Sequence, residues 1–177
     1  GGKNEYSGEG MGKISIDTPL AELTLRRYEK PAVTGRELVR RVCLSLGLLQ
    51  PGDSRDVMVD ILYVLLRARQ RSEELHSEEI KFAVMSIRKE KGLPMLGIAS
   101  SNIRRQLKRL KDMHLIESNA NLYRIMENAG LGELFRDKIE GFILKSVLGR
   151  VREYLKSVDE EFSLERVDEA EPIPKID

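Results

Sequence analysis

The residues from Ser100 to Glu117 read SSNIRRQLKRLKDMHLIE, and the first twelve of them hold five positive charges and no negative one. Arginine, asparagine and glutamine are the residue types that read guanine and adenine edges in the major groove, and lysine suits phosphates. A helix that is merely solvated normally intersperses glutamates among its bases. Basic helices without ligands are nevertheless common, so charge alone leaves the choice open between a solvated face and a binding surface.

The apolar residues of this stretch are sorted to one side. At 100° per residue, Ile103, Leu107, Leu110 and His114 fall close together, which predicts a helix with an inward stripe, N-capped by Ser100 or Ser101. The opposite side carries the predicted DNA-binding residues Ser101, Asn102, Arg104, Arg105, Gln106, Lys108, Arg109 and Lys111. Of these, Arg105 and Asn102 are the best candidates for base edges, and Arg109 and Lys111 for phosphates.

A hairpin is expected directly after this helix. Leu115 and Ile116 begin a strand, residues 118–121 turn, and residues 122–125 return, with Arg124 as a further phosphate anchor. The order of a serine, Ile103, Leu107, Leu110 and a Leu-Ile strand resembles the winged helix-turn-helix domains of bacterial and archaeal transcription regulators of the MarR and ArsR type.

This resemblance covers roughly residues 54–126 and implies binding of double-stranded DNA by a basic recognition helix, with regulation through occupancy of an operator. The chain departs from the family at three points. The connection over residues 91–99 is long, His114 stands where a glycine is frequent, and Arg124 is the only base of the wing.

Three helices are predicted to support the basic helix. The first starts at Gly35, with Arg36 at the surface and an inward stripe of Leu38, Val42, Leu46 and Leu49. The second spans residues 54–70 after an Asp53 cap. The third spans residues 78–91 after a Ser77 cap, and its inward residues are Ile80, Val84 and Ile87. An earlier helical segment is expected between Thr18 with Pro19 and Pro31.

The C-terminal region is predicted to be a long helix with a heptad-like seam. Leu148, Val151, Leu155, Val158 and Phe162 are spaced three and four residues apart, which is typical of a helix-helix interface. A homodimer is favoured, and packing against the chain's own N-terminal extension is the alternative.

The fold class expected is mainly α with a small β-hairpin: a winged helix-turn-helix with a helical N-terminal extension and a long C-terminal helix. The expected parts are a flexible tail over residues 1–13, partly derived from an expression vector, the extension over 14–51, the winged helix over 53–127, the helical dimerisation segment over 130–162 and a mobile acidic tail over 163–177.

The remaining composition argues against catalysis and against a metal or cofactor site. Cys43, the single cysteine, lies among apolar residues as a small buried hydrophobe would, and His76 and His114 lack the spacing of metal ligands. We therefore expect no enzyme, no metal and no cofactor. No apolar run is long enough to span a bilayer, so a cytoplasmic protein without membrane contact is expected.

Two other functions fit the same sequence. A winged-helix adaptor would use the basic face on acidic protein partners within a larger assembly. RNA binding is disfavoured by the 5% aromatic content, since single-stranded RNA is recognised by stacking. The sequence names neither an operator nor an effector ligand.

Overall fold

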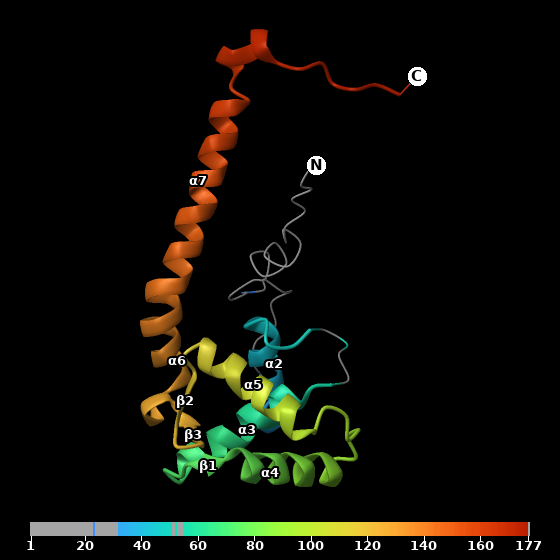
Figure 1. Ribbon diagram of the computed structural model, residues 1–177, viewed down its shortest axis with the longest axis vertical. Helices are drawn as coiled ribbons and strands as arrows, with labels where there is room; N and C mark the ends of the chain where they lie inside the picture. Colours follow the sequence, from blue (N-terminus) through green and yellow to red (C-terminus); the bar gives the residue numbers. More distant parts are fainter. Residues whose placement is uncertain (1–22, 24–31, 51, 53–54, 177) are drawn as a thin grey trace, which may run out of the picture. The chain divides into compact units, whose positions relative to one another are not determined.

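The computed structural model describes residues 23, 32–50, 52 and 55–176 (Figure 1). The predictions for the tail over residues 1–13, for Thr18, Pro19 and Pro31, and for the Asp53 cap lie outside these residues. The chain divides after Asn128 into two compact units, Gly1–Asn128 and Ala129–Asp177.

The first unit contains four α-helices among its described residues. They are α2 (Gly35–Ser45), α3 (Val57–Gln70), α4 (Ser77–Glu90) and α5 (Ser100–Asp112). Helix α3 contacts α2, α4, α5 and strand β3, and Ile61, Leu62 and Leu65 on it are fully buried. Burial of each such side chain contributes roughly 1.5–3 kcal/mol. This helix therefore forms the centre of the core of the unit.

A small antiparallel sheet completes the first unit. Strand β3 (Leu122–Ile125) lies between β1 (Leu75–His76) and β2 (Ile116–Asn119), with Ile116 opposite Ile125 and Leu75 opposite Tyr123. The hairpin turns through Ala120 and Asn121, whose φ angles of 49° and 64° are those of a type I′ turn. The mainly helical class with a β-hairpin is confirmed, and β1 is a third strand that the sequence did not predict.

The inward stripe predicted for α2 is confirmed only in part. Val39 and Cys43 are the buried residues of the helix, whereas Leu38 is exposed and Val42 partly buried; Leu49, also predicted inward, is buried after the helix ends. The reason is that Arg36, expected at the surface, shares the side of Val39 and Cys43. It forms ion pairs with Asp60 of α3 and with Asp56, which directly precedes that helix. The helix therefore presents one charged residue and two apolar residues to the core.

The start and one inward position of α4 also differ from expectation. Ser77 is the first residue of α4 rather than its cap; His76 takes the cap position, and its backbone N–H donates to Glu79 Oε1 at 3.0 Å. Ile87, expected inward on α4, is only partly buried, and the fully buried position next to it is Arg88.

His114 occupies a left-handed backbone position between α5 and β2. Its φ angle is 59° and its side chain is exposed, so the expectation that it packs inward is wrong; Met113 is the buried residue there. A glycine adopts this conformation without strain, which explains why the regulators that the chain resembles often carry one.

Replacing His114 by glycine is expected to raise the free energy of unfolding by about 0.5–1 kcal/mol, because relief of left-handed strain of roughly 1–2 kcal/mol exceeds the entropy gained by the unfolded chain. Urea unfolding followed by circular dichroism measures the change. The control is Ser86→Gly in the exposed middle of α4, which should instead lower the stability by roughly 0.5 kcal/mol. A destabilised His114→Gly variant would contradict this interpretation.

The second unit consists of helical segments. They are α6 (Leu131–Leu134), the π-helix η2 (Phe135–Leu144), α7 (Lys145–Glu161) and the 3₁₀ segment η3 (Leu164–Glu169). Gly141 lies in η2, where a Cβ would be 3.3 Å from the Arg136 carbonyl oxygen. The predicted long helical region is thus confirmed, with a π-helical first part.

Candidate nucleic-acid interface

Helix α5 presents its charges on the side opposite its core contacts. Ile103, Leu107 and Leu110 are buried, as predicted. The predicted binding residues Ser101, Arg104, Arg105, Lys108, Arg109 and Lys111 are exposed, and Asn102 and Gln106 are partly buried. The 13 residues of α5 correspond to a length of about 20 Å, and an α-helix fits the major groove.

The first turn of α5 is held by α4. The helix begins at Ser100 after Ala99, and no side chain of the described residues caps it, so the predicted serine cap is wrong. The Ser100 hydroxyl instead donates to Glu78 Oε1 and accepts from Lys81 Nζ, both at 3.1 Å. These two bonds fix the start of the basic helix on the preceding helix.

The long connection between α4 and α5 passes close to Asn102 and Val57 at Gly97. Its φ angle is 78°, and a Cβ there would lie 3.0 Å from Asn102 Nδ2 and 3.3 Å from Val57 Cγ2. Asn102 Nδ2 donates to the Gly97 carbonyl at 2.7 Å. The connection therefore anchors the N-terminal half of α5 through a position where any larger residue would be strained.

Two amide side chains orient two arginines along α5. Asn102 Oδ1 accepts from Arg105 Nη2 at 2.8 Å and from Gln106 Nε2 at 3.1 Å. Gln106 Oε1 in turn accepts from Arg109 Nη1 at 2.8 Å. Asn102, predicted as a base contact, thus has both the nitrogen and the oxygen of its amide engaged within the protein, and Arg105 and Arg109 are left to present the charge.

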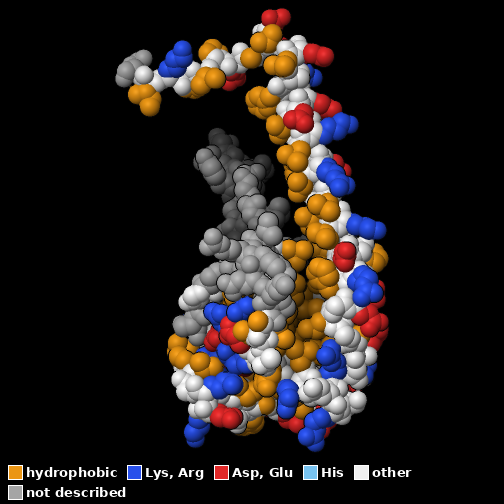
Figure 2. Space-filling view, turned by 180° about the vertical axis from the view of Figure 1, so that it is seen from behind, with side chains coloured by type: hydrophobic (Ala, Val, Ile, Leu, Met, Phe, Trp, Pro, Cys, Tyr) orange, Lys and Arg blue, Asp and Glu red, His pale blue; other side chains and the backbone are white. Residues whose placement is uncertain are grey.

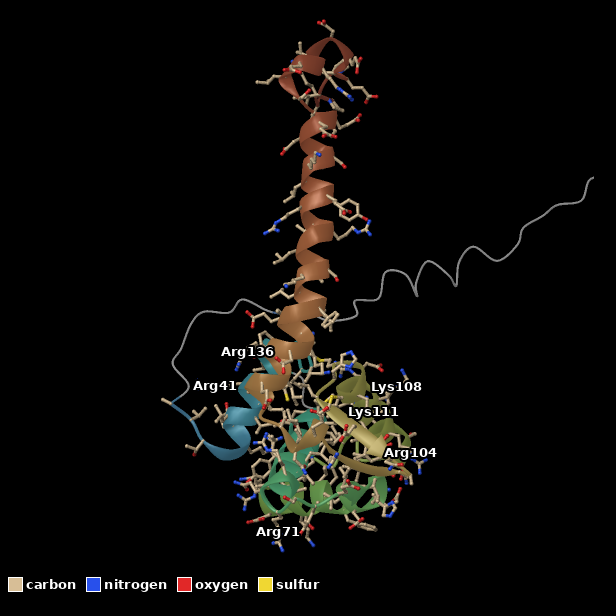
Figure 3. All side chains as sticks on the ribbon, turned by 90° about the vertical axis from the view of Figure 1, so that its left-hand side faces the viewer. Arg41, Arg71, Arg104, Lys108, Lys111 and Arg136 are labelled. Carbon is tan, nitrogen blue, oxygen red and sulfur yellow. The ribbon has the colours of Figure 1, made fainter. Side chains whose placement is uncertain are left out.

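The other cations of the helix are held more loosely. Figure 3 shows Arg104, Lys108 and Lys111 projecting from α5, and among the described residues Arg104 has no hydrogen bond or ion pair. Lys108 pairs with Asp112 at 3.1 Å, and Lys111 Nζ donates to the Ser118 hydroxyl at 2.9 Å. Exposed pairs of this kind contribute only about 0–1 kcal/mol, so both lysines can exchange them for phosphates.

A groove of about 430 Å³ runs beside the N-terminal half of α5. Arg105 and Arg109 line it from the helix, and residues 47–50 and Arg55 line it from the connection between α2 and α3. Arg109 Nη2 also donates to the Gly47 carbonyl at 3.4 Å. The positive surface of α5 therefore continues toward Arg55.

The hairpin contributes little positive charge. Arg124 Nε lies 2.6 Å from Glu117 Oε1 and 3.7 Å from Glu74 Oε1. The turn residues Asn119, Ala120 and Asn121 carry no charge. Arg124, predicted as a phosphate anchor, is thus neutralised by two carboxylates and stabilises the sheet.

A buried cluster of four charges lies among α2, α3 and α4, and it was not predicted from the sequence. Arg88 Nη1 donates to Asp56 Oδ1 at 2.8 Å and to Asp60 Oδ2 at 2.7 Å, and Arg88 Nε donates to the Pro94 carbonyl at 2.7 Å. Arg36 donates to Asp60 at 2.6 Å and to Asp56 at 2.8 Å. The side chains of Arg88 and Asp60 are 0% exposed.

The cluster joins α2, α3, α4 and the connection that leads into α5. Burial by itself would raise the pKa of Asp56, but hydrogen bonds and charges from Arg36 and Arg88 outweigh it and hold this pKa below its usual value. Burial would also lower the pKa of Arg36, and the two aspartates raise it instead. Asp56 and Arg36 therefore remain charged at neutral pH.

A signal for this cluster was present in the sequence. Asp60 interrupts the apolar face of its helix, and Arg88 follows Ile80 and Val84 at four-residue spacing on the inward side of the next helix. Opposite charges on the facing sides of two helices that pack together indicate a buried ion pair.

Other kinds of site find less support. Cys43 is fully buried, and burial raises the pKa of its thiol to about 12, which disfavours the reactive thiolate. Among the described residues, no three His, Cys, Asp or Glu side chains are placed to hold a metal ion. None of the helices in that part of the chain is long and apolar enough to cross a membrane.

Comparisons of the chain with protein-family models, curated proteins and solved structures found no match. A functional proposal therefore depends on the residues of this chain.

Proposed function

We propose that the protein is a winged helix-turn-helix regulator that binds double-stranded DNA through α5 and acts as a homodimer at an operator. The observation that carries the proposal is the sorting of α5. Five cations, Arg104, Arg105, Lys108, Arg109 and Lys111, are exposed on it, while its apolar stripe is buried and its start is fixed by Ser100 and Asn102.

The order of the elements supports the same assignment. Helices α3, α4 and α5 are followed at once by the β2–β3 hairpin, which is the layout of a winged helix. In helix-turn-helix proteins, the residues near the N-terminus of the recognition helix contact base edges. Arg105 is the base-reading candidate in this region, and Arg104 lies beside it without a partner among the described residues.

The phosphate contacts are assigned to Lys108, Arg109 and Lys111, with Arg104 as a fourth. Three or four phosphate contacts give a slope of log affinity against log salt of about −3, so affinity should fall roughly 100-fold between 50 and 200 mM salt. Because Arg124 is engaged by Glu117, it adds nothing to this slope.

Fluorescence anisotropy with labelled genomic DNA fragments across a salt series tests the proposal. The expected result is a preference for particular fragments over a competitor of random sequence, together with the stated slope. An Arg124→Gln variant is the control and should keep the slope of the parent protein. Absence of binding at low salt, or binding that salt does not weaken, would overturn the proposal.

An adaptor function is the second candidate, and the uncharged hairpin turn with its neutralised Arg124 favours it. In that case the basic face of α5 would bind an acidic protein surface. The two functions separate by experiment: an adaptor would lose its partner in pull-downs when Arg105 and Lys108 are replaced by glutamate, and would show no sequence preference for DNA.

A further inference from the structure

Helix α7 exposes a continuous apolar seam. Val151, Val158 and Leu155 are 46%, 52% and 58% exposed, and Phe162 directly after the helix is 80% exposed. Figure 2 shows hydrophobic side chains gathered along one side of α7. Monomeric soluble proteins rarely leave an apolar patch of this extent uncovered, so the seam requires a partner.

The spacing of the seam indicates that this partner is a helix. Leu148, Val151, Leu155, Val158 and Phe162 alternate in steps of three and four residues, which keeps one side of the helix directed at a neighbouring helix over its whole length. A groove in a globular surface does not demand such a regular repeat.

The charges along α7 are separated by sign. Residues 145–152 hold Lys145, Arg150 and Arg152 and no acid, a balance of +3; residues 153–161 hold four acids against Lys156, a balance of −3. Helix α7 continues η2 without a break in helical backbone and ends at Glu161, and its last turn, every residue of which the structure describes, has no base. Acids at a helix C-terminus are the reverse of what the helix dipole favours.

We infer that the partner of α7 is the α7 helix of a second copy of this chain, packed antiparallel. An antiparallel arrangement brings the positive half of each helix against the negative half of the other at both ends. A parallel pair would instead place like charges side by side along its length.

The apolar layers fit this arrangement with a two-fold axis beside Glu153. Pairs of residues equally distant from Glu153 then face each other: Leu144 with Phe162, Leu148 with Val158, and Val151 with Leu155 of the partner. Every residue of the seam then faces an apolar residue of the partner helix. The inference rests on the homodimer part of the proposed function and does not depend on DNA binding.

Distances between spin labels on the full chain test the orientation. Ser146, Glu153 and Glu160 are exposed and lie seven residues apart on the same outward side of the helix, so a single cysteine at each carries a label without touching the seam. Cys43 is buried and its thiol pKa is raised to about 12, so it stays unlabelled.

The antiparallel pair gives a clear pattern. Glu153→Cys should give the shortest distance between the two labels. Ser146→Cys and Glu160→Cys should each add a separation of about 21 Å along the helix axis, which is fourteen residues at 1.5 Å each. Equal distances at all three positions indicate a parallel pair and overturn the inference, and so does the absence of any intermolecular distance.

The oligomeric state gives an independent measurement. Analytical ultracentrifugation should show twice the mass of the 20.2 kDa chain at micromolar concentration. Leu155→Lys should shift the protein to a monomer with unchanged thermal unfolding of the N-terminal unit, while Ser157→Lys, at an exposed position outside the seam, should remain dimeric. A monomeric parent protein, or a dimer that Leu155→Lys leaves intact, contradicts pairing through α7 whatever the DNA assay gives.

Discussion

Replacing Arg88 by methionine is expected to lower the free energy of unfolding by about 3–5 kcal/mol, because it leaves Asp56 and Asp60 buried with only Arg36 to balance them. Methionine keeps most of the side-chain volume, so the loss arises from the charge and its hydrogen bonds rather than from a cavity. Urea unfolding at fixed protein concentration measures the change.

The matched control is Lys89→Met. It removes the same charge from the neighbouring, exposed position of α4 and should change the stability by less than about 0.5 kcal/mol. Asp60→Asn provides a second test of the cluster, since it removes one carboxylate with little change in shape. If Arg88→Met costs less than about 1 kcal/mol, the four charges do not hold these helices together.

Reversing two charges on α5, Arg105→Glu with Lys108→Glu, is expected to weaken DNA binding by about 100-fold or more at moderate salt. Each reversal removes an attraction and adds a repulsion, and single contacts of this kind contribute about 1–3 kcal/mol. Anisotropy with the preferred DNA fragment measures the loss, and circular dichroism checks that both proteins are folded.

The control reverses the same number of charges elsewhere. Lys89 and Lys91 are exposed at the end of α4, so Lys89→Glu with Lys91→Glu alters the net charge equally. This control should weaken binding only a few-fold through the general field of the protein. If both double variants lose affinity equally, the binding surface is not α5.

Within the proposed interface, the sequence predicts one role for the Asn102 amide and the structure indicates another. Spacing along α5 placed Asn102 beside Arg105 on a polar face, where both are suitable base readers. In the structure, the side-chain amide of Asn102 is hydrogen-bonded to Gly97, Arg105 and Gln106, and it therefore positions the Arg105 side chain. The Gly97 carbonyl comes from the connection before the helix, and helical periodicity carries no information about it.

The sequence by itself determined the elements whose burial pattern follows local periodicity. The inward positions of α5, the hairpin after it, the apolar core of α3 and the continuous helix ending in α7 all follow from the spacing of apolar residues, because neighbours on one helix face are set by 3.6 residues per turn. The apolar seam and the separated charges of α7 also follow from the spacing of residues along a single helix.

Only the tertiary structure decided which distant charges meet. The cluster consists of Arg36, Asp56, Asp60 and Arg88, which come from three helices and from the residue before α3. They lie up to fifty-two positions apart in the chain, so no local pattern pairs them. Their meeting rotates α2 by one residue from its apolar stripe, makes Arg88 a core residue of α4, and engages the Pro94 carbonyl of the connection into α5. The physical reason is that a buried charge is stable only beside its counter-charge, and the packing of whole helices determines where that counter-charge lies.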